Sequence, residues 1–150
     1  MVYVVSLEAN LDNMVQKAAD FHGHMGPFLV VGVRMGIVGL QKLGVRRGDD
    51  SLSATVFVEP SVPFSCAIDG IQVTTKCTIG NGKLRLRNSP KEISTVFEVS
   101  GGKQVTVTLN PVMLTKLKRS LRKIAASEKL EEIAGVVASV PDQELFLIQQ

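Results

Sequence analysis

The residues best suited to chemistry are His22 and His24, the two histidines of the chain, which stand on either side of Gly23. On a continuous helix, residues two apart point in divergent directions. In a loop with a glycine between them, both rings can turn toward one point. Such a pair suits metal binding or acid–base catalysis. The alternative is that both rings hydrogen-bond to helix ends, and the motif alone leaves the two interpretations open.

Cys66 is the second candidate, because it stands near the predicted start of a helix. The positive end of the helix dipole would lower the pKa of a thiol at that position. Asp69 and Gln72 follow at helical spacing, so the three side chains can share one face. Spacing alone favours the plainer interpretation, which is a small buried Cys, an Asp in the first helical turn and an exposed Gln.

Cys77 and Arg34 are further candidates. Cys77 follows Cys66 by 11 residues, which on an unbroken helix separates the two by about 16 Å. Both thiols could therefore serve one site only if the helix ends early or a second subunit supplies one, and packing is the alternative for Cys77. Arg34 is the lone charge in an apolar stretch. A buried Arg needs a carboxylate, an anionic ligand or a helix end, whereas one that reaches solvent carries no functional meaning.

Apolar periodicity and the positions of Gly and Pro predict the elements that position these residues. Helices are predicted over residues 11–21, 28–43, 66–75, 111–124 and 130–140, and strands over residues 52–59, 83–87, 92–99, 103–109 and 145–148. Asn110 and Pro111 have the residue types of a helix N-cap and first helical position. The Gly-rich segment 78–83 lacks the spacing of a phosphate-binding P-loop and is predicted to be a turn. The whole chain, residues 1–150, is predicted to be one compact α+β domain.

Three glycines, Gly32, Gly36 and Gly39, lie along one face of the predicted second helix. Each interior glycine costs up to about 1 kcal/mol relative to Ala, so a line of three indicates close approach of another backbone. We predict that this line, or the sheet beside it, is buried in a homodimer, although the chain's own helix could equally fill it.

The composition of the chain limits the kinds of partner that we expect it to bind and the compartment in which we expect it. The chain is mildly basic, with a net charge of +3 and a pI near 9.0, and only 5% of its residues are aromatic, which argues against nucleic-acid binding. The most apolar stretch, residues 28–40, is too short to cross a membrane. Two cysteines form no disulfide framework and the first residues lack a signal peptide, so the protein is expected in the cytoplasm with reduced thiols. One helix carries a basic run that is either a solvated face or a docking surface for an acidic protein partner: Lys116, Lys118, Arg119, Arg122 and Lys123.

Three segments in order carry a resemblance to a known family. Residues 21–24 (FHGH) followed by residues 32–34 (GVR) resemble the HGH…GxR signature of the formylmethanofuran dehydrogenase E-subunit family. Residues 66–72 (CAIDGIQ) are similar to that family's C-x-x-D-A-I-Q segment, and residues 77–80 (CTIG) to its C-T-x-G segment. The similarity covers about residues 11–110.

The resemblance implies an α+β fold with an antiparallel sheet packed against helices, a homodimer, and a metal-binding cleft lined by the His and Cys of these motifs. We predict His22, His24 and Cys66 as ligands of a divalent metal, zinc suiting such donors best. Cys66 and Asp69 are the predicted catalytic residues, and Arg34, Gln72 and Cys77 the predicted substrate-binding residues.

The family name implies an accessory subunit of a molybdenum or tungsten oxidoreductase of methanogenesis, or a small metal-dependent enzyme of one-carbon or redox metabolism. The alternative is a non-catalytic assembly module that docks through the basic helix 112–124. Gly26 and Phe28 stand where the family commonly has Cys and Gly, so one expected thiolate is missing. The sequence also carries no Cys-rich zinc ribbon like that of some members.

Overall fold

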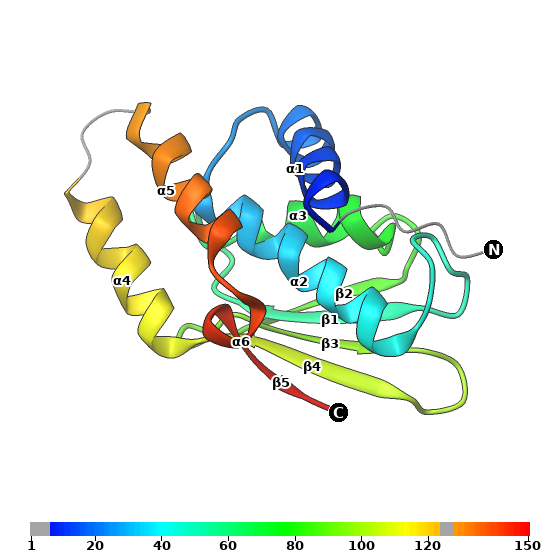
Figure 1. Cartoon of the computed structure of the whole chain (residues 1–150). Coiled ribbons are helices and arrows are strands. Elements are labelled where there is room, and N and C mark those ends of the chain that lie inside the picture. The colour runs from blue at the N-terminus through cyan, green and yellow to red at the C-terminus, as the bar shows by residue number, and fades with distance from the viewer. Residues whose placement is uncertain (1–6, 124–127) are drawn as a thin grey trace.

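The chain folds into a five-stranded sheet with helices stacked on one face. A computed structural model describes residues 7–123 and 128–150. Helices α2 (Pro27–Leu43) and α3 (Cys66–Thr75) lie directly above the sheet, and α1 (Leu7–His22) packs on top of both (Figure 1). Helix α5 (Glu128–Ser139) lies beside α2, while α4 (Pro111–Arg122) stands to one side (Figure 1).

The strands are β1 (Ser53–Val58), β2 (Leu84–Asn88), β3 (Ser94–Glu98), β4 (Gln104–Leu109) and β5 (Phe146–Gln149). Their order across the sheet is β2-β1-β3-β4-β5. The strands predicted over residues 92–99 and 103–109 form a hairpin around Ser100-Gly101-Gly102, because β3 pairs antiparallel with β4. The predicted antiparallel sheet has one exception: β1 and β2 run parallel. Helix α3 connects these two strands and returns the chain to the same end of the sheet, which makes the pair parallel.

The helices also follow the predicted ranges closely. Helix α1 begins at Leu7 rather than at residue 11, and a short helix α6 (Asp142–Leu145) precedes β5 without having been predicted. Asn110 caps α4 as expected, since its side-chain oxygen accepts a hydrogen bond of 3.0 Å from the backbone N–H of Val112. The last residue of the helix predicted over residues 111–124, and the first residues, 1–6, lie outside the described residues. No helix in the described ranges combines the length and the apolar character needed to cross a membrane.

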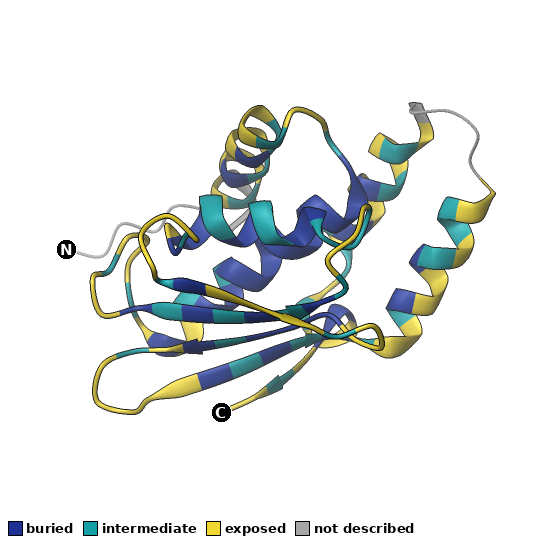
Figure 2. Cartoon of the chain, turned by 180° about the vertical axis from the view of Figure 1, so that it is seen from behind, coloured by how far each residue is buried: buried dark blue, intermediate teal, exposed yellow. Residues whose placement is uncertain are grey.

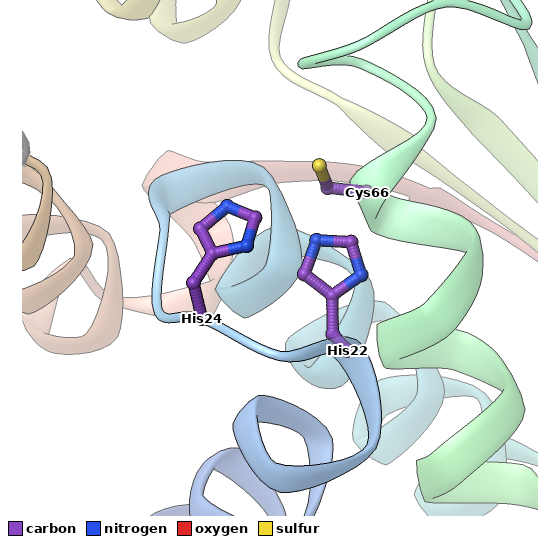
Figure 3. Close-up of side chains that lie close together, drawn as sticks. All are labelled: His22, His24 and Cys66. Carbon is purple, nitrogen blue, oxygen red and sulfur yellow. The ribbon is translucent and has the colours of Figure 1, made fainter.

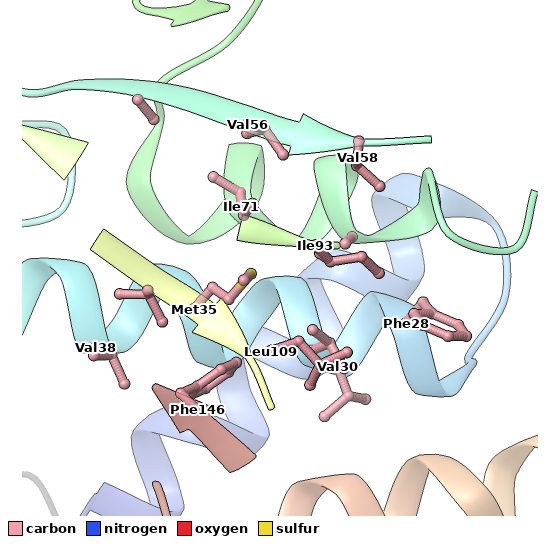
Figure 4. Close-up of a cluster of buried hydrophobic side chains, with 14 of the residues drawn as sticks. Phe28, Val30, Met35, Val38, Val56, Val58, Ile71, Ile93, Leu109 and Phe146 are labelled. Carbon is pink, nitrogen blue, oxygen red and sulfur yellow. The ribbon is translucent and has the colours of Figure 1, made fainter. Parts of the chain in front are cut away.

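The core lies between the sheet and helices α2 and α3. Inward side chains of the strands, such as Val56 and Leu109, meet Met35 and Val30 of α2 and Ile71 of α3 (Figure 4). Buried residues alternate along β1 and β4, which is the pattern of strands with one face on a core (Figure 2). Helix α2 is buried over almost its whole length, because the sheet, α3, α1 and α5 surround it.

The glycine line of α2 is filled by the same chain, which was the alternative to a dimer interface there. The homodimer itself stays a prediction. A Cβ built on Gly32 would lie 2.0 Å from the carbonyl oxygen of Ala67 in α3, and one on Gly36 would lie 2.8 Å from the Thr74 side chain. At Gly39 the neighbour is the Phe97 ring of β3, at 2.6 Å. Gly70 of α3 makes the same close approach from the other helix, since a Cβ built on it would lie 2.4 Å from the Leu29 carbonyl oxygen. The two helices therefore cross with their backbones in contact.

Replacing Gly32 with Ala should destabilise the fold by on the order of 3 kcal/mol, because the added methyl group meets a helix backbone that cannot move aside. Gly135→Ala is the matched control. Gly135 also lies inside a helix, but no atom of the described residues lies within 4 Å of its Cβ position, so this change should stabilise the protein by about 0.5–1 kcal/mol. Urea unfolding of the two variants measures the difference. Equal stabilities would contradict the close crossing.

Candidate metal centre

Three candidate ligands meet where the loop between α1 and α2 faces the first residue of α3. His22 is the last residue of α1, and Gly23, at a φ of +102°, turns the chain out of the helix. Pro27 then begins α2, so His24 lies in a loop of four residues, 23–26. Cys66 opens α3 directly opposite. Figure 3 shows the two imidazole rings side by side with the Cys66 sulfur next to them.

The geometry brings one nitrogen from each histidine and the Cys66 sulfur within 4.8 Å of one another. The two ring centroids are 4.6 Å apart and the planes are inclined at 38°. His22 is partly buried, Cys66 is buried and His24 is exposed. The predicted convergence of these residues, across more than 40 positions of sequence, is therefore present in the fold.

A chain of hydrogen bonds orients His22. Its Nδ1 lies 2.6 Å from Oδ2 of Asp69, and Oδ1 of the same carboxylate accepts a bond of 3.2 Å from the Gln72 amide. The Gln72 carbonyl oxygen in turn accepts from the backbone N–H of Ile79 at 3.2 Å. Because a carboxylate only accepts, Nδ1 of His22 carries the proton, and in the neutral ring Nε2 keeps its lone pair. Nε2 is buried and has no hydrogen-bond partner among the described residues.

The environment of Cys66 differs from the predicted one. Burial, and then the negative charge of Asp69, raise the pKa of the Cys66 thiol. We expected the helix dipole to lower it. However, the chain already turns before α3, and the backbone N–H groups of Cys66, Ala67 and Ile68 donate to the carbonyls of residues 63, 64 and 65. The backbone N–H of Cys66 still lowers the pKa of the thiol, but burial and the charge of Asp69 outweigh it.

The donor set fits a borderline divalent ion. Imidazole nitrogen and thiolate sulfur are the ligands that zinc prefers, and a carboxylate behind a ligating histidine is its common partner. An unpaired, buried Nε2 beside a thiol is otherwise costly, and a metal ion would satisfy it. Gly26 borders the same centre, because a Cβ there would lie 3.8 Å from His24 Nε2. The Cys that the family commonly has at position 26 would lie beside His24. With glycine at this position, that side of the centre offers no side-chain ligand and forms an open corner.

Cys77 does not join this group. It is buried, its thiol points to the carbonyl oxygen of Leu52 at 3.5 Å, and burial raises the pKa of that thiol. The packing alternative is the one that the structure favours, and nothing in its position supports substrate binding. The segment instead serves the centre through the backbone N–H of Ile79, which we did not predict. Asn81 shapes that turn by accepting from the N–H groups of Thr78 and Lys83, at 3.0 Å each.

Arg34 finds two of the partners that a buried Arg requires, a helix end and a carboxylate. Its guanidinium donates to the carbonyl oxygens of Val137 and Val140 at the end of α5, and to Asp142 Oδ1 at 2.6 Å. These bonds tie α2 to the C-terminal elements and occupy the guanidinium. The predicted substrate-binding role of Arg34 has no support in this arrangement.

Fold and centre together define an α+β domain with a His–His–Cys cluster ordered by a carboxylate. A family model described as "FmdE, Molybdenum formylmethanofuran dehydrogenase operon" matches residues 21–147. The chain therefore belongs to the FmdE family, as its motifs predicted.

A "Probable S-adenosyl-L-methionine-binding protein" of Archaeoglobus fulgidus is 33% identical to the chain over 136 residues, which cover 87% of this chain. The aligned region makes up 34% of that relative, so the chain spans about a third of its length.

Arg34→Met should lower the free energy of unfolding by about 2–4 kcal/mol, because it leaves two carbonyls and a carboxylate without their donor. Metal affinity should be unchanged, since no bond of Arg34 reaches the centre. Asp142→Asn is the milder companion change, because the Asp142 side chain is 48% exposed and water can replace it. Thermal melts and zinc titration separate the two effects, and loss of zinc binding in a folded Arg34→Met protein would show that Arg34 does influence the centre.

Proposed function

We propose that the chain is a metal-binding FmdE-family protein whose ion is held by His22, His24 and Cys66. It would serve as an accessory subunit or as a small metal-dependent enzyme of one-carbon or redox metabolism. The observation that carries the proposal is the meeting of three donors within 4.8 Å. One of them is a buried imidazole nitrogen without a partner among the described residues.

Three ligands with an open corner resemble a catalytic zinc site more than a structural one, which normally has four protein ligands. A zinc ion bound there would supply Lewis acidity and a lowered pKa for a bound water. Asp69 holds the proton on Nδ1 of His22 and so presents Nε2 to the ion. His24, being exposed, would form the side of the centre that a substrate reaches.

Cys66 would bind as the thiolate. Because its pKa is raised in the metal-free protein, the thiol is protonated at neutral pH, and binding must release that proton. Affinity should therefore increase with pH until the thiol titrates. Asp69 keeps its predicted role as a catalytic residue within this proposal, either orienting the ligand or accepting a proton.

The proposal extends to the setting of the protein. We place it in the cytoplasm, where both thiols would remain reduced, and we retain a homodimer as its proposed assembly. The interface would not be the glycine line, which α3 and Phe97 fill.

A docking module without chemistry is the second candidate. On α4 the side chains of Lys116, Arg119, Arg122 and Lys123 are exposed, whereas Lys118 lies over the Phe64 ring at 5.3 Å. An acidic partner would meet this face. A purified protein that contains no stoichiometric metal and takes up none on titration would favour the module.

The printed name of the Archaeoglobus relative adds S-adenosyl-L-methionine as a candidate ligand. The 33% identity over 136 residues favours testing it, although most of that relative lies outside the shared region. Calorimetric titration of the chain with S-adenosyl-L-methionine tests this directly.

Replacing Cys66 with Ser should abolish stoichiometric zinc binding while leaving the fold nearly intact, because the two side chains are similar in volume and the imidazole nitrogens beside this buried position offer a hydroxyl polar neighbours. Cys77→Ser is the matched control and should keep its zinc. Its hydroxyl is buried, so that variant should lose on the order of 1–2 kcal/mol of stability instead. Metal analysis and thermal melts of both variants check these expectations. The reverse pattern, with zinc retained in Cys66→Ser, would exclude Cys66 as a ligand.

A second change tests the open corner. Gly26 has extended backbone, at a φ of −159°, and its Cβ position meets only the His24 ring within 4 Å. Gly26→Cys should therefore be accommodated and should add a fourth ligand, tightening zinc binding by at least about tenfold. Gly26→Ser is the control without a thiolate. Competition against a chelator of known affinity measures the change, and equal affinity in the two variants would place the ion elsewhere.

A further inference from the structure

A groove lies beside the C-terminal half of α3, with Gln72, Val73 and Lys76 in its wall. Its volume is about 500 Å³, and its walls come from α1, α3, the loop after α2 and the turn before β2. Gln72 lines it and also holds Asp69, so the groove begins one hydrogen bond away from the His22 carboxylate partner. From Asp69 to Lys76 the helix rises about 10 Å. A ligand lying in the groove would therefore have one end near the centre.

The far end of the groove is strongly positive. Lys17, Arg47 and Lys76 line it, and the part of the chain that the structure describes contributes no carboxylate to its wall. All three side chains are exposed, and none forms an ion pair within the described ranges of the chain. Three converging cations without counter-charges repel one another, and a bound anion removes that repulsion.

A hydrogen bond fixes one of these cations, and the stem of a second lies against the backbone. Arg47 donates from Nε to the carbonyl oxygen of Val73 at 2.9 Å, which leaves both terminal nitrogens free for a ligand. The Lys76 stem passes over Gly48, where an added Cβ would lie 3.3 Å from its Cδ. A guanidinium with two free nitrogens matches the geometry of a phosphate group.

The near end offers a flat apolar surface. Phe21 lines the groove immediately before His22 and is 62% exposed. A phenylalanine left open beside a cationic groove is suited to stacking against a planar ring. The Thr78 hydroxyl, also in the wall, can still donate a hydrogen bond to a ligand, because in its bond with the Asn81 N–H it is the acceptor.

We propose that this groove binds a phosphorylated ligand that carries a flat aromatic ring, of which a nucleotide is the simplest example. The phosphate would lie among Lys17, Arg47 and Lys76, and the ring against Phe21. The volume is within the range of small-molecule sites. This chemistry differs from that of S-adenosyl-L-methionine, which has no phosphate and carries a positive sulfonium. The groove does not need the metal ion, so its test uses metal-free protein.

Calorimetric titration of the EDTA-treated chain with ADP, inorganic pyrophosphate and adenosine tests the proposal. ADP should bind with the highest affinity of the three, and added salt should weaken its binding, because the phosphate contacts are ionic and exposed. The double variant Lys17→Gln/Lys76→Gln should bind ADP at least tenfold more weakly. Lys116→Gln, which removes one exposed charge from α4, is the control and should bind ADP like the unchanged chain.

Phe21→Ala separates the ring from the phosphate. It should weaken ADP severalfold and leave pyrophosphate unchanged, and thermal melts should show an intact fold because the ring is mostly exposed. Absence of saturable ADP binding up to about 5 mM would overturn the proposal. Unaltered ADP affinity in the double lysine variant, or tighter binding of S-adenosyl-L-methionine than of ADP, would overturn it as well. Zinc binding is measured separately, so failure here leaves the metal proposal standing.

Discussion

The contact between the backbones of α2 and α3 is the constraint on which the rest of the structure depends. Gly32 and Gly70 remove the side chains at the crossing, and the Ala67 carbonyl fills the space that a Cβ on Gly32 would need. Helices with larger residues at the contact pack about 8–10 Å apart. A wider crossing would lift the first turn of α3 away from the loop before α2, and Cys66 and Asp69 would leave His22 and His24. The glycines thus lower the helix propensity of α2 and α3, but they allow the close crossing that keeps Cys66 and Asp69 beside the two histidines.

Much of the fold could be predicted from the sequence, because local signals agree with the final packing. The β3–β4 hairpin flanks a Ser-Gly-Gly turn, and Asn110 with Pro111 marks the start of α4, so both elements were expected in their observed places. The parallel pairing of β1 and β2 was not expected, since strand direction follows from how the chain returns across the sheet. The partner of the glycine line was also undetermined, because periodicity shows that a face is buried but not against what.

The candidate centre was likewise predictable from the sequence in some respects and not in others. Residue types and motif order predicted that His22, His24 and Cys66 lie close together, and the structure places them so. Asp69 lies behind His22 and orients its ring. The raised pKa of the Cys66 thiol could not be predicted, because it depends on how deeply the thiol is buried and on how near the Asp69 carboxylate lies in the folded chain. Cys77 and Arg34 carried residue types suited to a site, yet each is engaged by the backbone elsewhere. The part that Ile79 plays was missed, because it contributes its backbone N–H and the type of its side chain gives no sign of this.

The centre is unequal on its two sides, and this inequality bears on its chemistry. On the inner side His22 is fixed by Asp69, which Gln72 and the Ile79 backbone hold in turn. On the outer side His24 is exposed and Gly26 contributes no side chain. A structural ion is enclosed by four ligands that the fold orders equally. Here the ordered half would fix the ion in position, while the open half leaves room for an exchangeable ligand. In the metal centre that we propose, such a division would suit an ion that binds a substrate better than an ion that only stabilises the fold.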